Sequence, residues 1–141
     1  MRNKIIVAFV LILSGLTGLT GYAVGRAQSA SGKVYELRVY SAADGKLDAL
    51  NARFRDNTIR IFNRHHMKSV GYWVPTEGDK AGNTLIYILE HPSREDAKKN
   101  WAEFNADPEW QKVKAESEAN GKLVLKAEPT FMAATDYSPI K

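Results

Sequence analysis

The chain predicts an α+β fold of the ferredoxin-like, split βαβ type, preceded by an N-terminal targeting segment. Strand-like and helix-like stretches follow one another in the order strand, helix, strand, strand, helix, helix, strand, which is the order of that motif. About 110 residues remain after the targeting segment, enough for a single domain that folds alone. The expected product is a four-stranded antiparallel sheet with helices on one face.

Residues 1–31 are predicted to be a signal peptide or an N-terminal membrane anchor. Arg2 and Lys4 precede an uncharged apolar run over residues 5–25, and small residues follow, which is the layout of a secretory signal. The run is long enough to span a bilayer, although four glycines dilute its hydrophobicity. Cleavage and export, to the periplasm or the exterior, is the preferred interpretation. Tethering to the membrane by residues 5–25 is the alternative.

The net positive charge of the chain comes largely from this segment. The whole sequence has 20 Lys and Arg against 16 Asp and Glu, and three of the basic residues lie in the first 30 positions, which hold no acid. The remainder is nearly neutral, so nucleic acid is not expected as a partner. There is no cysteine, so a domain in an oxidising compartment has to be held by its core or by association.

The first strand is predicted over residues 33–40, where residue types alternate. The alternation puts Glu36, Arg38 and Tyr40 on one face of the strand. A long helix is predicted over residues 46–66, because its apolar positions recur with a 3.6-residue period. Those positions are Leu47, Leu50, Phe54, Ile61 and Phe62, with Thr58 filling the gap and Arg53, Arg60 and Arg64 on the opposite side.

The second and third strands are predicted over residues 67–75 and 83–91, joined by a polar, glycine-rich loop. The third strand is nearly continuous in apolar residues, which predicts a central strand covered on both faces.

The next helix begins at Ser93 with Asp96 three residues later, a variant of the capping box, and it buries Ala97, Trp101 and Phe104. Asp107 with Pro108 caps one more helix. The last strand is predicted over residues 122–134, where Pro129 marks a bulge or an edge.

This arrangement leaves one face of the sheet uncovered. The uncovered face carries apolar side chains from several strands, and such a patch calls for a partner. A second copy of the same sheet is the simplest partner, which predicts a two-fold homodimer.

Six local motifs in order, over residues 33–138, make the chain resemble the NIPSNAP family. They are Tyr35–Tyr40, Gly45–Leu47, Gly71–Trp73, Asn83–Tyr87, Ser93–Arg94 and Asp107–Trp110. The resemblance implies a dimeric α+β barrel and a NIPSNAP-like domain over residues 33–138. It implies no established catalytic residues, and some members of the family act in vesicle traffic or mitochondrial signalling.

The polar cluster Glu36, Arg38 and Tyr40 is the main candidate site. Arg38 can bind an anionic group with two parallel hydrogen bonds, and Glu36 can act as an acid or base if its pKa is shifted. The alternative, which we favour, is that Glu36 and Arg38 pair and satisfy an interface. His91 follows at the end of the third strand, where it either sits at a cavity mouth or, as we favour, is structural.

Trp73 and Tyr87 are predicted either to line a pocket for a flat apolar ligand or to fill a dimer core, whereas Trp101 and Trp110 are predicted to pack helices on the sheet. His65 and His66 are adjacent, and neighbours on a helix point about 100° apart, so no metal site is predicted. There is no nucleotide-binding loop and no serine nucleophile elbow. No cofactor is therefore assigned.

The leading function is an exported, homodimeric module that binds a small apolar or anionic ligand, or an interaction partner. The alternative, which rests on fold analogy, is a monooxygenase-like or haem-handling enzyme that uses a cavity near Glu36, Arg38 and Tyr40. A structural dimer with no ligand is the third class. The membrane is a partner only if the N-terminal segment is uncleaved.

Overall fold

The structure, a computed structural model, describes residues 32–141. The predicted signal or anchor segment lies outside the described residues. The elements are β1 (Val34–Ala42), α1 (Leu47–Arg53), η1 (Phe54–Thr58), α2 (Ile59–Arg64), β2 (Lys68–Trp73), β3 (Thr84–His91), α3 (Arg94–Ala106), α4 (Pro108–Ser117) and β4 (Val124–Met132). In this part of the chain no helix combines the length and the apolar character needed to cross a membrane.

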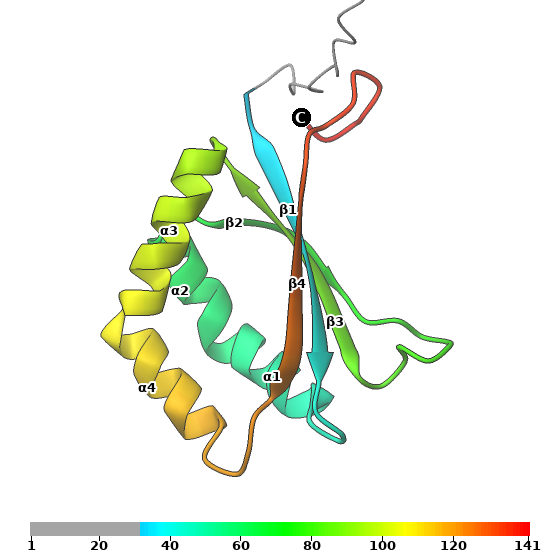
Figure 1. Ribbon diagram of the computed structural model, residues 1–141, viewed down its shortest axis with the longest axis vertical. Coiled ribbons are helices and arrows are strands. Elements are labelled where there is room, and N and C mark those ends of the chain that lie inside the picture. The colour runs from blue at the N-terminus through cyan, green and yellow to red at the C-terminus, as the bar shows by residue number, and fades with distance from the viewer. Residues whose placement is uncertain (1–31) are drawn as a thin grey trace, which may run out of the picture.

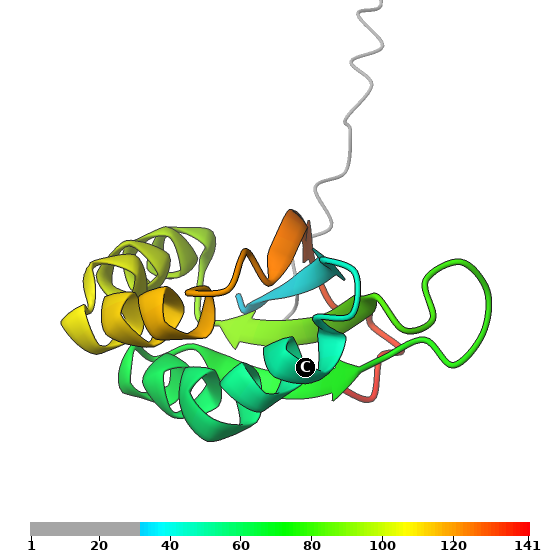
Figure 2. The same ribbon diagram turned by 90° about the horizontal axis from the view of Figure 1, so that it is seen from below.

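The four strands form one antiparallel sheet in the order β2-β3-β1-β4. The helices gather on one side of it (Figures 1 and 2). The predicted α+β fold, with a four-stranded antiparallel sheet and helices on one face, is therefore confirmed. Pro129 lies on β4, which is an edge strand as its proline requires.

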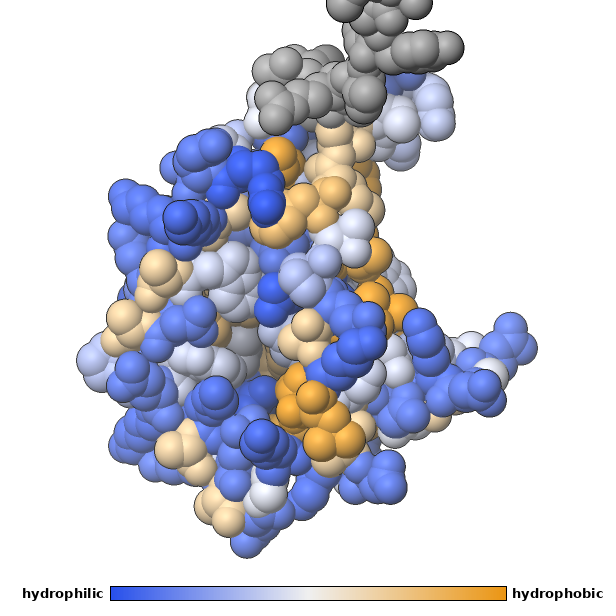
Figure 3. Space-filling view, viewed as in Figure 1, coloured by the Kyte–Doolittle hydropathy of each residue, from blue (hydrophilic) through white to orange (hydrophobic). Residues whose placement is uncertain are grey.

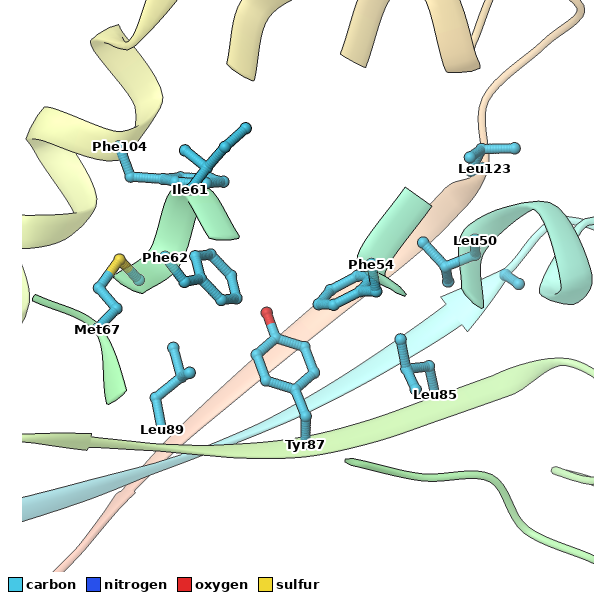
Figure 4. Close-up of a cluster of buried hydrophobic side chains, with 11 residues drawn as sticks. Leu50, Phe54, Ile61, Phe62, Met67, Leu85, Tyr87, Leu89, Phe104 and Leu123 are labelled. Carbon is cyan, nitrogen blue, oxygen red and sulfur yellow. The ribbon is translucent and has the colours of Figure 1, made fainter. Parts of the chain in front are cut away.

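The core fills the space between the sheet and the helices (Figure 4). Its largest members are Leu50, Phe54, Ile61, Phe62, Met67, Leu85, Tyr87, Leu89, Phe104 and Leu123. Burying a side chain of this size stabilises the fold by about 1.5–3 kcal/mol, so this cluster dominates the stability. On β3 the buried positions alternate, and Ile86 and Ile88 are only half-buried. The expectation that this strand is covered on both faces is wrong for the single chain, because helices lie on one side alone.

The long helix predicted over residues 46–66 contains a π-helical turn, η1. In that turn the Ile59 N–H donates to the Phe54 carbonyl, five residues back, and the Thr58 hydroxyl donates to the Arg53 carbonyl at 3.2 Å. Arg53 was predicted on the polar side, which is wrong. It is buried because α4 covers it and because Glu118 pairs with it at 3.0 Å.

The helix starts follow the predicted capping chemistry. The Ser93 hydroxyl oxygen accepts from the Asp96 N–H at 3.0 Å at the start of α3. The Asp107 carboxylate accepts from the N–H groups of Glu109 and Trp110 at the start of α4. Both predictions are confirmed, because they depend on neighbours in sequence.

The sheet face away from the helices is apolar along its centre. Leu37 lies opposite Ile88 and Val39 lies opposite Ile86 across the β1–β3 pair. Trp73, half exposed, lies opposite Ile86 on β2. We call this set, Leu37, Val39, Trp73, Ile86 and Ile88, the outer face.

Candidate functional site

A cavity of about 330 Å³ lies between the helices and the β1–β4 half of the sheet. The surface is visibly recessed between the helices and β4, with hydrophilic residues around the recess (Figure 3). Six aromatic side chains line the cavity: Tyr40, Phe54, Phe62, Trp101, Phe104 and Trp110. Its charged lining residues are Arg38, Arg53, Lys114, Glu118 and Lys122. The volume lies within the range of small-molecule pockets.

Glu36 on β1 is the buried polar centre beside this cavity, with 1% of its surface exposed. Its carboxylate accepts hydrogen bonds from Arg38 at 2.9 Å, from the Trp101 indole N–H at 2.7 Å and from His91 Nε2 at 3.0 Å. Three donors thus meet one carboxylate, from β1, α3 and β3. This number of donors is what a buried carboxylate requires to stay ionised.

The pKa of Glu36 reflects that balance. Burial raises the pKa of Glu36, but the hydrogen bonds from His91 and Trp101, together with the charge and hydrogen bond of Arg38, outweigh burial and leave it below its ordinary value. The pKa of Arg38 is lowered by burial and raised more strongly by Tyr40, Tyr87 and Glu36. Both groups are therefore charged across the physiological range.

Arg38 connects this centre to the cavity wall. One of its terminal nitrogens donates to Glu36, and the other donates to the Tyr40 hydroxyl at 3.1 Å. Its guanidinium lies over the Trp101 ring, 4.4 Å from the centroid, within the distance of a cation–π interaction. The side chain is consequently fixed on three sides.

Tyr87 stands on β3 at the centre of an aromatic group. Its hydroxyl points away from the sheet toward the gap between Phe54 and Phe62 (Figure 4), and its ring lies 5.2 Å from that of Tyr40. The hydroxyl is buried, and Tyr40 and Arg38 are its polar neighbours. Burial, and secondarily Tyr40, raises the pKa of Tyr87 well above its ordinary value, while Arg38 acts in the opposite direction.

The structure brings five of the six predicted site residues together: Glu36, Arg38, Tyr40, Tyr87 and His91. Of the two alternatives for His91, the structure has it fully buried against Glu36 and not at a cavity mouth.

Trp73 does not share a pocket with Tyr87, because the two lie on opposite faces of the sheet. The strand register sets this separation, since Tyr72, and not Trp73, pairs with Tyr87. The Trp73 ring instead lies over Gly71, where an added Cβ would come within 2.7 Å of the indole. Trp73 therefore belongs to the outer face.

Trp101, which was predicted only to pack a helix on the sheet, also has a polar role. Trp101 packs on Phe62 and Phe104 as predicted, but its indole N–H also holds Glu36. The signal was present, since a largely buried indole N–H needs an acceptor. Arg53 was missed as well, and it lines the cavity beside the π-helical turn, a type of turn that is frequent at functional sites.

The cavity has a basic rim. Arg38 is offset by Glu36, and Arg53 is offset by Glu118. Lys114 and Lys122 are exposed lining residues, and neither has an acidic partner within residues 32–141. Across the same residues no group of three or more His, Asp or Glu side chains is placed to hold a metal ion. The arrangement suits an organic molecule with a negative charge near the rim.

The chain is similar to proteins of one family in both sequence and fold. The sequence profile of the NIPSNAP family matches residues 35–139. A NIPSNAP family protein of unknown function from Agrobacterium tumefaciens is 25% identical, with a TM-score of 0.69 over 81% of this chain and 98% of that one. A NIPSNAP-like domain protein from Burkholderia xenovorans is 19% identical, with a TM-score of 0.68 over 77% and 90% of the two chains.

The fold is also shared more distantly. SnoaB, a cofactor-independent oxygenase from Streptomyces nogalater, is 16% identical, with a TM-score of 0.51 over 77% of this chain and 98% of that one. At this identity the likeness concerns the fold alone. No curated protein matches the chain. Because the profile covers most of the sequence and the solved structures that resemble it include several members, the chain belongs to the NIPSNAP family.

Proposed function

We propose that this NIPSNAP domain binds a small aromatic molecule that carries an anionic group, in the cavity between the helices and the β1–β4 half of the sheet. The observation that carries the proposal is the combination of an aromatic wall with a basic rim. Pockets for small molecules are mostly apolar, with few polar groups that fix orientation.

The aromatic wall sets the shape of the ligand. Tyr40 comes from β1 on the sheet side, whereas Phe54 from η1 and Trp101, Phe104 and Trp110 from α3 and α4 lie on the helix side. Aromatic faces and edges pack best against other flat ring systems. A flat ligand can thus make contacts on both sides of the cavity.

The rim sets the charge of the ligand. Lys114 from α4 and Lys122 from the α4–β4 connection are the lining cations without an offsetting carboxylate. An anionic group placed between them gains Coulomb energy, and because both lysines are exposed this gain is modest and falls with salt. The apolar body of the ligand therefore supplies most of the affinity.

An enzymatic role is the second candidate, supported by the likeness in fold to the oxygenase SnoaB. For that role the acid–base groups have to reach the ligand. Arg38 and Tyr40 line the cavity, whereas Glu36 and His91 do not line it and are almost completely buried. Binding is therefore better supported than turnover.

The proposal includes export of the protein and a homodimer formed through the outer face. The outer face exposes half of Trp73, and a second copy would bury this apolar set. The basic, then apolar, N-terminal sequence supports export. Native mass spectrometry of the protein from the exported fraction tests both, since a dimer of shortened chains is expected. An unprocessed chain that needs detergent would contradict cleavage, and a monomer would contradict the dimer.

The binding proposal is tested by calorimetric titration with naphthalene-2-sulfonate, a flat ring system with one anionic group. We expect saturable binding, and we expect Ala127→Phe to weaken it at least tenfold. Ala127 lines the cavity and lies opposite Tyr40 on β4, so the added ring occupies the ligand space. Ala115→Phe is the matched control, because Ala115 is exposed on α4 and is not a lining residue. Absence of binding, or equal binding by both variants, would overturn the proposal.

A further inference from the structure

We infer that the inner end of this cavity recognises a hydrogen-bond-accepting oxygen of the ligand, a carbonyl or phenol oxygen, through the Tyr40 hydroxyl and the Arg38 guanidinium. This inference rests on the proposed function and narrows it. The ligand class becomes a flat ring system with an anionic group at one end and an acceptor oxygen at the other.

Arg38 has more donors than it uses. A guanidinium carries five N–H groups, and the hydrogen bonds of Arg38 to described side chains go to Glu36 and Tyr40. Its Nε–H is buried without a partner among residues 32–141. Since buried polar groups are almost always hydrogen-bonded to protein, water or ligand, this surplus leaves Arg38 able to bond an acceptor from outside the chain.

The Tyr40 hydroxyl adds a donor on the cavity surface. Its oxygen accepts from Arg38 at 3.1 Å, so its own proton is directed elsewhere. Tyr40 lines the cavity and is only partly buried. A ligand can therefore reach this hydroxyl.

Tyr87 adds a third hydrogen-bonding side chain next to Arg38 and Tyr40. Arg38 lies directly opposite Tyr87 in the β1–β3 register, and the buried Tyr87 hydroxyl has Tyr40 and Arg38 as its polar neighbours. The Tyr40 and Tyr87 rings are in edge-to-face contact. Three side chains that can donate hydrogen bonds thus converge, and they stand on the two central strands, which hold them rigidly.

The charge balance selects the kind of oxygen. Glu36 is bonded to Arg38 at 2.9 Å and is itself buried, so the positive charge of Arg38 is already offset. A neutral or partly charged oxygen suits such a site, whereas a full anion is better placed at the rim, near Lys114 and Lys122. The two ends of the cavity thus recognise different groups.

The test compares two probes that differ by one oxygen. Naphthalene-2-sulfonate carries the anion alone, and 6-hydroxynaphthalene-2-sulfonate adds a hydroxyl at the far end of the same ring system. We expect the native protein to bind the hydroxylated probe about tenfold more tightly, which is about 1.4 kcal/mol. We expect Tyr40→Phe to reduce that preference to less than threefold, because the ring stays and the donor is lost.

Tyr72→Phe is the matched control. Tyr72 also contacts Tyr87, but its hydroxyl is already bonded to Ser69 at 2.6 Å and it does not line the cavity. This variant should keep the tenfold preference. If Tyr40→Phe does not fold, equal affinity of the native protein for the two probes still overturns the inference.

The outcomes separate the acceptor inference from the proposed function. Equal affinity of the native protein for the two probes, or a preference retained in Tyr40→Phe, would overturn the acceptor inference and leave the binding cavity standing. Failure of both probes to bind would overturn the proposed function itself and the inference with it. A preference lost in Tyr40→Phe and kept in Tyr72→Phe would establish the assignment.

Discussion

The indole N–H of Trp101 donates to the carboxylate of Glu36 at 2.7 Å, and this bond joins α3 to the centre of the sheet. Glu36 is 1% exposed, so its charge depends on the donors that surround it. Trp101 is one donor, and His91 and Arg38 are the others. Helix packing and the polar centre of the site are therefore coupled through a single side chain.

Replacement of Trp101 by Phe should lower the free energy of unfolding by about 1–3 kcal/mol, because a buried carboxylate loses one of its hydrogen bonds. Urea denaturation measures the change. Trp110→Phe is the matched control, since Trp110 packs on Phe104 nearby and its indole N–H makes no side-chain hydrogen bond in the described chain. Equal losses in the two variants would show that ring packing, rather than the bond to Glu36, matters.

Replacement of Arg38 by Ala should lower the free energy of unfolding more than replacement of Trp101 by Phe does. Arg38→Ala leaves Glu36 buried without its ion-pair partner, and breaking a buried pair from one side costs about 3–5 kcal/mol. Denaturation of Arg38→Ala, Glu36→Gln and the double variant forms a cycle that isolates the coupling. We expect the free energy of unfolding of the double variant to fall by clearly less than the sum of the decreases in the two single variants. Strict additivity would contradict the pairing.

Stability should fall in acid because of the network between α2 and the start of α4. Hydrogen bonds from Arg60 and Arg64 lower the pKa of Glu109 from 4.5 to about 2. Hydrogen bonds from His65 and then Arg64 hold the pKa of Asp107 well below its ordinary value.

A depressed pKa in the folded state contributes stability that is present above the unfolded value and is lost as the pH falls through the folded value. We therefore expect Tm to decrease between about pH 4.5 and pH 2 and to decrease less in Arg64→Met, measured by circular dichroism. Lys99→Met is the control, because its contact with Glu103 is a long, exposed one at 3.9 Å. An equal acid dependence in the two variants would contradict a role for the network.

The proposed homodimer predicts that Trp73→Asp shifts the protein from dimer to monomer in sedimentation velocity. The indole is half exposed on the outer face, and a carboxylate placed between two apolar sheets would be desolvated without a partner. Ala115→Asp, on the exposed side of α4, should leave the dimer intact. An unchanged profile for Trp73→Asp would remove the outer face from the interface.

The features predicted correctly from the sequence are local or periodic. The caps at Ser93 and Asp107 involve residues two or three positions apart. The alternation along β1 correctly put Glu36, Arg38 and Tyr40 on one face, where a chain of hydrogen bonds joins them. Such patterns follow from strand and helix geometry alone.

The features that were missed depend on register and packing. A shift of one residue in strand pairing exchanges the two faces, and β2 has an irregularity between Ser69 and Gly71, so the face of Trp73 could not be read from the sequence. The partners of Arg53 and Trp101 come from distant elements. His66 adopts a left-handed backbone with φ of 58°, a conformation usual for glycine, which its residue type did not indicate.

The two outermost strands govern how this protein can associate. β4 carries Pro129, which has no N–H, together with the charged Lys126 and Glu128, and β2 is interrupted between Ser69 and Gly71. Proline, charge and bulges each discourage the addition of another strand. Growth of the sheet from molecule to molecule, which leads to open-ended fibres, is thus disfavoured at both ends, in keeping with the proposed contact through a sheet face.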